Sequence, residues 1–356
     1  MMKQLVHVWR IPFLILAIFS LIAGLWTGLS RIGWDTFILP ASAHHGAIMV
    51  GGFLGTLISL EKIIPLKVRW LFVLPAMSIS SVLFFMLGQP VLSFASLIVS
   101  GIGLTGVFVY YLTKERNMIY ALMLVGALCL LVGNILLSTS RFYPLAFPWW
   151  VGFILFIIAA ERLELMKFLP VTVIAKRYFI GMLIAFLAGI LISFHNYGNI
   201  AAGAALIAIA LWLLKNDAIA IGLRKNSLTR FVSVSLMLGY LALLIAGLFF
   251  VSFSDHWLAY DALVHTFFIG FAFSMIFAHG PIILPGVIGI SFKPYHRILY
   301  LWLMLMHSSW LIRVIADAYS QMEWRKYSGL LSATAIVGYF LTLAFLTARQ
   351  QYGKVR

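Results

Sequence analysis

Cysteine and charged residues are both scarce in this sequence. Cys129 is the single cysteine among 356 residues, which excludes a disulfide framework. Only 10% of the residues are charged, whereas 63% are hydrophobic, and the mean hydropathy is +1.06. No soluble core needs that much apolar surface. The composition therefore excludes an ordinary soluble domain and indicates a protein whose surface mostly faces lipid.

The sequence is instead rich in long hydrophobic runs, most of them near the ~20 residues that a membrane-spanning helix needs. Turn signals such as Gly88-Gln89-Pro90, Tyr143-Pro144, Pro148 and Gly280-Pro281 separate the runs. We expect one all-α transmembrane domain over residues 1–356 with about 12 transmembrane helices. They cover residues 11–30, 40–60, 69–88, 90–112, 118–138, 149–166, 178–194, 198–214, 231–252, 257–279, 295–316 and 328–347.

Basic residues outnumber acidic ones by 25 to 10, and their positions predict the topology. Two arginines, Arg162 and Arg313, lie within hydrophobic segments. Four cations fall on one side of the predicted membrane: Arg31, Arg141, Arg325 and Lys326. The remaining cations fall on the opposite side, which the positive-inside rule assigns to the cytoplasm together with both termini. The basic excess is thus a topology signal, and we expect no nucleic-acid partner.

A short pattern recurs three times. Each Gly-Phe pair is followed, nine residues after its glycine, by an ionisable residue: Gly52-Phe53 by Glu61, Gly152-Phe153 by Glu161, and Gly270-Phe271 by His279. The pairs fall on predicted helices 2, 6 and 10. This spacing predicts three pseudo-repeated four-helix arcs, at about 1–112, 113–214 and 215–356, with those helices on the inside.

Histidines on three of the predicted helices share one depth. At 1.5 Å per residue, His45 lies about 8 Å below the outer end of helix 2, and His265 about 12 Å below that of helix 10. His307 lies about 12 Å from the outer end of helix 11 in a core of about 30 Å. Membrane-embedded imidazoles usually face a functional interior, and neutral imidazole binds haem iron and copper. The alternative is a histidine hydrogen-bonded to a carbonyl or hydroxyl group of a neighbouring helix.

Other residues extend this hypothesis. His44 is adjacent to His45 and points about 100° away, so only one of the two is expected to bind a given iron. Asp261 lies one turn before His265 and could orient its ring, whereas His279 lies about 21 Å lower on the same helix. Cations at the outer level are candidate clamps for haem propionates, with interfacial cations as the alternative. They are Arg141, Arg313, Arg325 and Lys326.

The twelve helices, the His44-His45-Gly46 start of helix 2 and the stretch from His265 to Pro281 resemble the NnrS group of membrane proteins. The chain is more distantly similar to the catalytic subunit of haem-copper oxidases, which is built from three four-helix arcs. The resemblance implies haem, of b type, with His265 and either His44 or His45 as axial ligands. It also implies copper as a further metal, nitric oxide as a ligand, a quinol or cytochrome as electron donor, and the bacterial cytoplasmic membrane as location.

The sequence departs from both families at the residues that are expected to bind copper. Helix 6 has no histidine and helix 7 has only His195, so an oxidase-type tyrosine–histidine copper centre is not expected. The His-x-His-Glu pattern usual in NnrS helix 2 is also replaced, by His44-His45-Gly46. The candidate metal-binding residues remain His45, His265, His307 and His279.

Three functions follow from these observations. The first is a haem protein that acts in nitric oxide metabolism, in the response to nitrosative stress or in membrane electron transfer; as an enzyme it would be an oxidoreductase acting on nitric oxide. The second is a twelve-helix secondary transporter, which internal repeats and a re-entrant Pro281–Pro285 segment would favour. The third is an assembly factor whose histidines only pack.

Overall fold

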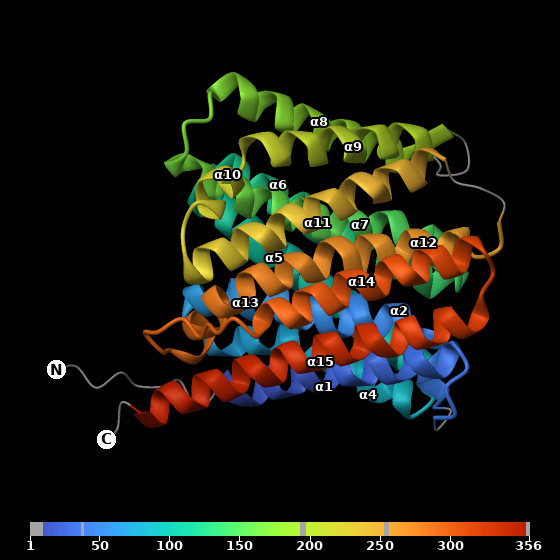
Figure 1. Ribbon diagram of the computed structural model, residues 1–356. Helices are drawn as coiled ribbons and strands as arrows, with labels where there is room; N and C mark the ends of the chain where they lie inside the picture. Colours follow the sequence, from blue (N-terminus) through green and yellow to red (C-terminus); the bar gives the residue numbers. More distant parts are fainter. Residues whose placement is uncertain (1–9, 37–38, 193–196, 253–255, 354–356) are drawn as a thin grey trace. The chain divides into compact units, whose positions relative to one another are not determined.

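The computed structural model describes residues 10–36, 39–192, 197–252 and 256–353. His195 lies outside these ranges. The described residues form helices and connecting turns without any strand, which confirms the all-α class. The chain divides into two compact units, an N-terminal unit within Val6–Glu164 and a C-terminal unit within Leu165–Arg356 (Figure 1).

The N-terminal unit contains six of the long hydrophobic helices, several of which are built from consecutive shorter pieces. Its elements are α1 (Ile11–Arg31), η2 (Pro40–His44), α2 (His45–Ala47), η3 (Ile48–Leu54), α3 (Gly55–Ile63), η4 (Ile64–Leu66), η5 (Arg69–Phe72), α4 (Val73–Met86), α5 (Pro90–Lys114), α6 (Met118–Ser140) and α7 (Tyr143–Leu165).

The C-terminal unit contains the other six. Its elements are η6 (Met166–Phe168), α8 (Val173–Leu191), α9 (Asn199–Asn216), α10 (Ile219–Leu223), α11 (Ser227–Val251), α12 (Ala259–His265), η8 (Thr266–Ala272), α13 (Phe273–Ile288), α14 (Leu299–Ala318) and α15 (Met322–Gly353).

Twelve helices in the described residues are long and apolar enough to cross a membrane, as the hydrophobic runs predict. The three that carry the Gly-Phe pairs have the most buried apolar stretches. Within an 18-residue apolar window of each helix, 67% of the residues are buried in Pro40–Leu66, 72% in Tyr143–Phe168 and 61% in Ala259–Ile288, against at most 50% in the windows of the others. These helices therefore lie inside, where membrane proteins keep their functional polar groups. The arrangement in three four-helix arcs stays a prediction.

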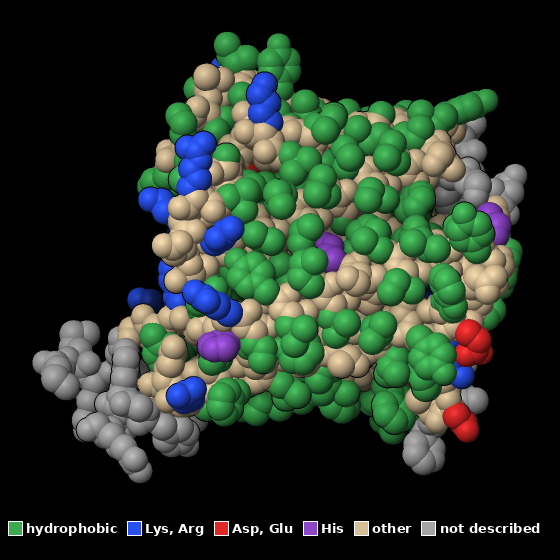
Figure 2. Space-filling view, viewed as in Figure 1, with side chains coloured by type: hydrophobic (Ala, Val, Ile, Leu, Met, Phe, Trp, Pro, Cys, Tyr) green, Lys and Arg blue, Asp and Glu red, His purple; other side chains and the backbone are tan. Residues whose placement is uncertain are grey.

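The surface of the C-terminal unit matches a membrane environment. Hydrophobic side chains cover the flanks of its helices in Figure 2, whereas Lys and Arg gather at the end where α11 begins and α13 ends. Arg224, Lys225 and Arg230 flank the start of α11, and Lys293 and Arg297 follow α13. Such a division suits helices whose flanks face lipid and whose ends face water and headgroups.

The tenth membrane helix continues beyond the end that its sequence suggests. We predicted a stop at Gly280-Pro281, but α13 passes Pro281 and Pro285 and ends at Ile288, so this prediction and that of a re-entrant segment are wrong. Pro281 has no N–H to donate to the carbonyl of Phe277, one turn earlier. The Tyr339 hydroxyl of α15 donates to that carbonyl instead, at 2.7 Å. Similarly, α7 begins at Tyr143 and runs through Pro148, which we had expected to precede the helix.

Replacing Tyr339 by Phe is therefore expected to destabilise the protein by about 1–3 kcal/mol, the cost of a buried carbonyl left without its donor. Tyr339 and Phe277 are both fully buried, so water cannot replace the hydroxyl. Adding Pro281→Ala restores a main-chain N–H and should recover much of the loss. Equal costs of Tyr339→Phe with and without Pro281→Ala, in denaturant unfolding of detergent-solubilised protein, would contradict this account.

Two of the three inner helices contain a π-helical stretch. In helix 2 it is η3, which contains Gly52-Phe53 and starts three residues after His45. In helix 10 it is η8, which contains Gly270-Phe271 and starts directly after His265. The third pair, Gly152-Phe153, lies in the regular helix α7. Because π-helical turns occur frequently at functional sites, the two histidines become the first residues to examine.

Candidate functional site

His265 ends α12 in the C-terminal unit and is held by the turn before it. Its Nδ1 lies 2.8 Å from the main-chain oxygen of Asp261 and 3.5 Å from that residue's carboxylate. A carbonyl oxygen can only accept, so the proton of the neutral ring sits on Nδ1 and Nε2 keeps its lone pair. This arrangement of main-chain acceptor and imidazole is the one that typically orients metal-binding histidines.

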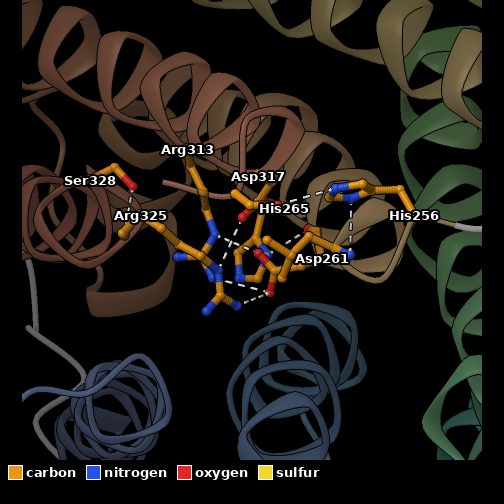
Figure 3. A network of polar contacts seen from close by, with 9 residues as sticks. His256, Asp261, His265, Arg313, Asp317, Arg325 and Ser328 are labelled. Carbon is orange, nitrogen blue, oxygen red and sulfur yellow. Dashed lines mark hydrogen bonds and ion pairs between the residues drawn. The ribbon is translucent and has the colours of Figure 1, made fainter. Parts of the chain in front are cut away.

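Asp261 is the centre of a network that joins three helices (Figure 3). Arg313 of α14 donates hydrogen bonds from two nitrogens to the Asp261 carboxylate, at 2.8 and 3.1 Å. Arg325 of α15 contacts the same carboxylate at 3.0 Å and forms an ion pair with Asp317, also at 3.0 Å. The Asp317 contact lacks the alignment of a hydrogen bond, although Asp317 is only 1% exposed. Two carboxylates thus balance two guanidinium groups beside His265.

The structure changes the roles that we predicted for the outer cations. Arg325 and Lys326 do not lie in a loop but in the first turns of α15, which begins at Met322. Arg313 and Arg325 are already engaged by Asp261 and Asp317, so a haem propionate would have to compete with these carboxylates. Their direct effect is to fix Asp261, whose main chain holds His265. Sequence reasoning missed Asp317. The feature that could have revealed it is an acidic residue near the end of a hydrophobic helix.

The ring of His45, in the N-terminal unit, is also held by a hydrogen bond from Nδ1 to a main-chain oxygen. Its Nδ1 lies 2.7 Å from the main-chain oxygen of Gly24 in α1, which again places the ring proton on Nδ1. The ring packs against Gly28, where an added Cβ would stand 2.8 Å from Cε1. Two glycines one turn apart on α1 thus supply both the acceptor and the space for the imidazole.

His44 has a different environment. Its ring stacks on Phe85 with 4.4 Å between centroids and meets the edge of Phe94 at 5.6 Å. Its Nδ1 lies 3.2 Å from the hydroxyl of Tyr143, which can donate or accept. The guanidinium group of Arg141 lies over the ring of Phe94, 4.2 Å from its centroid. Of the two neighbouring histidines, His45 is therefore the one whose Nε2 is fixed as a nitrogen with a lone pair.

His307 does not share the level of His265. Its Nε2 pairs with the hydroxyl of Ser274 at 2.8 Å, and Ser274 lies nine residues, or about 13 Å, further along the helix than His265. The predicted common depth is wrong because α14 begins at Leu299 and the preceding helix extends to Ile288. The Nδ1 accepts from Trp310 at 3.0 Å, so a metal could bind only if one of the two bonds broke.

The remaining metal candidates do not cluster within the described ranges. His279 donates from Nδ1 to the carbonyl of Met275 at 2.6 Å. No group of three or more His, Cys, Asp or Glu side chains among the described residues could hold a metal ion. Haem iron needs only one or two imidazoles from the protein, so the prepared histidines fit haem better than a copper centre.

A second polar cluster lies in the N-terminal unit. The ammonium group of Lys62 in α3 lies 2.8 Å from Glu61 and 2.6 Å from Glu161 of α7. The two glutamates are those that follow Gly52-Phe53 and Gly152-Phe153, so two copies of the repeated pattern meet at one lysine. We had counted Lys62 only as a cytoplasmic cation, because hydropathy does not reveal which helices touch.

Fold and site together define a multi-pass α-helical membrane protein. Its partly buried histidines His265 and His45 donate to main-chain oxygens, and ion pairs lie beside His265. The chain belongs to the family described as Domain of unknown function (DUF8744), whose profile matches residues 10–348. No curated protein and no solved structure matches the chain.

Proposed function

We propose that the protein binds haem in the membrane, with His265 as an iron ligand in the C-terminal unit and His45 as an iron ligand in the N-terminal unit. The observation that carries the proposal is the hydrogen-bond geometry and helix position that these two imidazoles share. Each ring donates from Nδ1 to a main-chain oxygen, at 2.8 Å in His265 and 2.7 Å in His45, and each histidine stands just before a π-helical stretch. Two partly buried histidines with the same tautomer, each set before a local departure from the α-helix, favour ligation over packing alone.

The residues around each histidine suit a haem ligand. The carbonyl acceptors hold each ring in one orientation and raise the basicity of Nε2. The ion pairs of Asp261 with Arg313 and Arg325 fix the turn that carries His265, and Gly24 and Gly28 fix His45. When bound, haem supplies an iron that binds nitric oxide or carries one electron. The chain holds and orients the ligands and keeps water away with its apolar helices.

The physiological setting of the proposal comes from the resemblance to the NnrS group. It comprises the bacterial cytoplasmic membrane, a role in nitric oxide metabolism, in nitrosative stress or in electron transfer, and a quinol or cytochrome as electron donor. An enzyme of this kind would be a haem-dependent oxidoreductase. Copper is a weaker part of the proposal, since the prepared histidines fit haem better.

Secondary transport is the second candidate, and the buried charges of Glu61, Lys62 and Glu161 favour it. A reduced-minus-oxidised visible spectrum of detergent-purified protein, expressed with ample haem, separates the two. Sharp haem bands that shift on titration with nitric oxide are the expected result. A protein that folds with all its helices and yet shows no haem bands would overturn the haem proposal and shift the weight to transport.

A further inference from the structure

Asp317, in the last turn of α14, is buried without a hydrogen bond to its side chain. The residue is only 1% exposed, and neither carboxylate oxygen accepts a hydrogen bond from any residue that the structure describes. Its contact with Nε of Arg325, at 3.0 Å, is an ion pair that lacks hydrogen-bond alignment. Buried carboxylates normally accept hydrogen bonds, because burial otherwise disfavours their charge. The negative charge of Asp317 is therefore poorly stabilised.

Asp261 of α12 is the opposite case. Both of its carboxylate oxygens accept hydrogen bonds from Arg313, at 2.8 and 3.1 Å, and Nη2 of Arg325 lies 3.0 Å from Oδ1. Nδ1 of His265 lies a further 3.5 Å from Oδ2. Such an array of donors favours the ionised form of a carboxyl group. Of the two acids, Asp261 is thus the one that keeps its negative charge.

The two carboxyl groups lie beside one another along one edge of Arg325 (Figure 3). Nη2 of this guanidinium group contacts Oδ1 of Asp261, and its Nε contacts Oδ1 of Asp317, both at 3.0 Å. The same edge of Arg313 binds both oxygens of a single carboxylate. The carboxyl groups of Asp261 and Asp317 lie within hydrogen-bonding reach of each other. Two acceptors at that range repel each other unless a proton lies between them.

The helices packed against this end of α14 are α15, α12, η8 and α11. The acids, bases and imidazoles that α15, α12 and the turn before α12 bring here are His256, Asp261, His265, Glu323, Arg325 and Lys326. Of these, Arg325 and Asp261 contact Asp317. Neither η8 nor residues 241–251 of α11 contain a titratable side chain. On α14 itself, Arg313 lies one turn before Asp317 and donates to Asp261.

We propose that Asp317 is a proton-binding site, which takes up and releases one proton while Asp261 stays ionised. The proton comes from water at the end of α14, where Tyr319, two residues further along, is 74% exposed. It adds to a carboxylate oxygen of Asp317, and the new O–H donates to the carboxylate of Asp261. Proton uptake removes one negative charge from the network beside His265 and releases Arg325 from its ion pair with Asp317. Proton binding at Asp317 does not require haem.

Infrared difference spectroscopy of the full-length protein in liposomes, between acidic and alkaline pH, tests the proposal. The carbonyl stretch of a protonated carboxyl group that exchanges hydrogen for deuterium is expected in the wild type and lost in Asp317→Asn. In Asp261→Asn the band should titrate at a lower pH than in the wild type. The neighbouring negative charge is then absent, and the new amide can donate to the carboxylate of Asp317.

Glu323→Gln is the matched control, because this exposed acid lies in the first turn of α15 and should leave the band unchanged. Circular dichroism and gel filtration establish that each variant is folded. Asn has nearly the shape of Asp and the charge of its protonated form, so the comparison with Asp317→Asn stands even if Asp261→Asn fails to fold. An unchanged band in Asp317→Asn would mean that Asp317 stays ionised and would overturn the proposal, as would a wild type without a titrating carboxyl band.

Discussion

Replacing His265 by Ala is expected to abolish the haem bands of the purified protein. The imidazole Nε2 is the group proposed to bind iron, and Ala offers no substitute ligand. The measurement is the reduced-minus-oxidised spectrum per mole of folded protein, and the expected loss exceeds ten-fold. Because Nδ1 of His265 bonds to a main-chain oxygen, the substitution should leave the network of Asp261, Arg313 and Arg325 intact.

Matched histidine variants make this result specific. His45→Ala is expected to lower the haem bands as well, whereas His44→Ala and the exposed His296→Ala should retain them. His307→Asn should also retain them, since both of its ring nitrogens are used by Ser274 and Trp310. Full haem content in His265→Ala, with a wild type that binds haem, would refute the assignment of this ligand while sparing the cofactor.

Replacing Asp261 by Ala is expected to destabilise the protein by about 3–5 kcal/mol, the cost of breaking a buried ion pair and leaving its partner without a counter-charge. Arg313 is only 4% exposed and loses both of its contacts to this carboxylate. Arg325 keeps Asp317 as a partner. The free energy of unfolding in detergent, measured with denaturant, checks the prediction.

The same variant separates stability from ligation. An alanine in place of Asp261 would still present the main-chain oxygen to which His265 donates, so the protein that folds should retain haem. Glu115→Ala, on an exposed residue, is the control and should change the unfolding free energy by less than about 0.5 kcal/mol. A cost of Asp261→Ala as small as this control's would mean that the ion pairs around Asp261 contribute nothing to the fold.

The membrane class and the twelve helices could be predicted from the sequence, because hydropathy and helix length are properties of the local chain. The inner position of the helices with Gly-Phe pairs also followed from a sequence pattern, and the structure confirms it by their burial. His45 and His265 were selected in the same way, as imidazoles within hydrophobic segments. The ends of the helices were less certain, because Pro281 reads as a stop unless Tyr339 is known to lie beside it.

Only the tertiary structure decided which polar groups meet. The sequence does not show that Arg325 of α15 reaches Asp261 and Asp317, that Ser274 and Trp310 use both nitrogens of His307, or that Lys62 joins two glutamates from different helices. Each of these contacts depends on which helices pack together and at what height. Hydrophobicity determines that a segment enters the membrane. It hardly affects how the helix is rotated about its axis or which helices lie next to it, and these are selected by packing and buried hydrogen bonds.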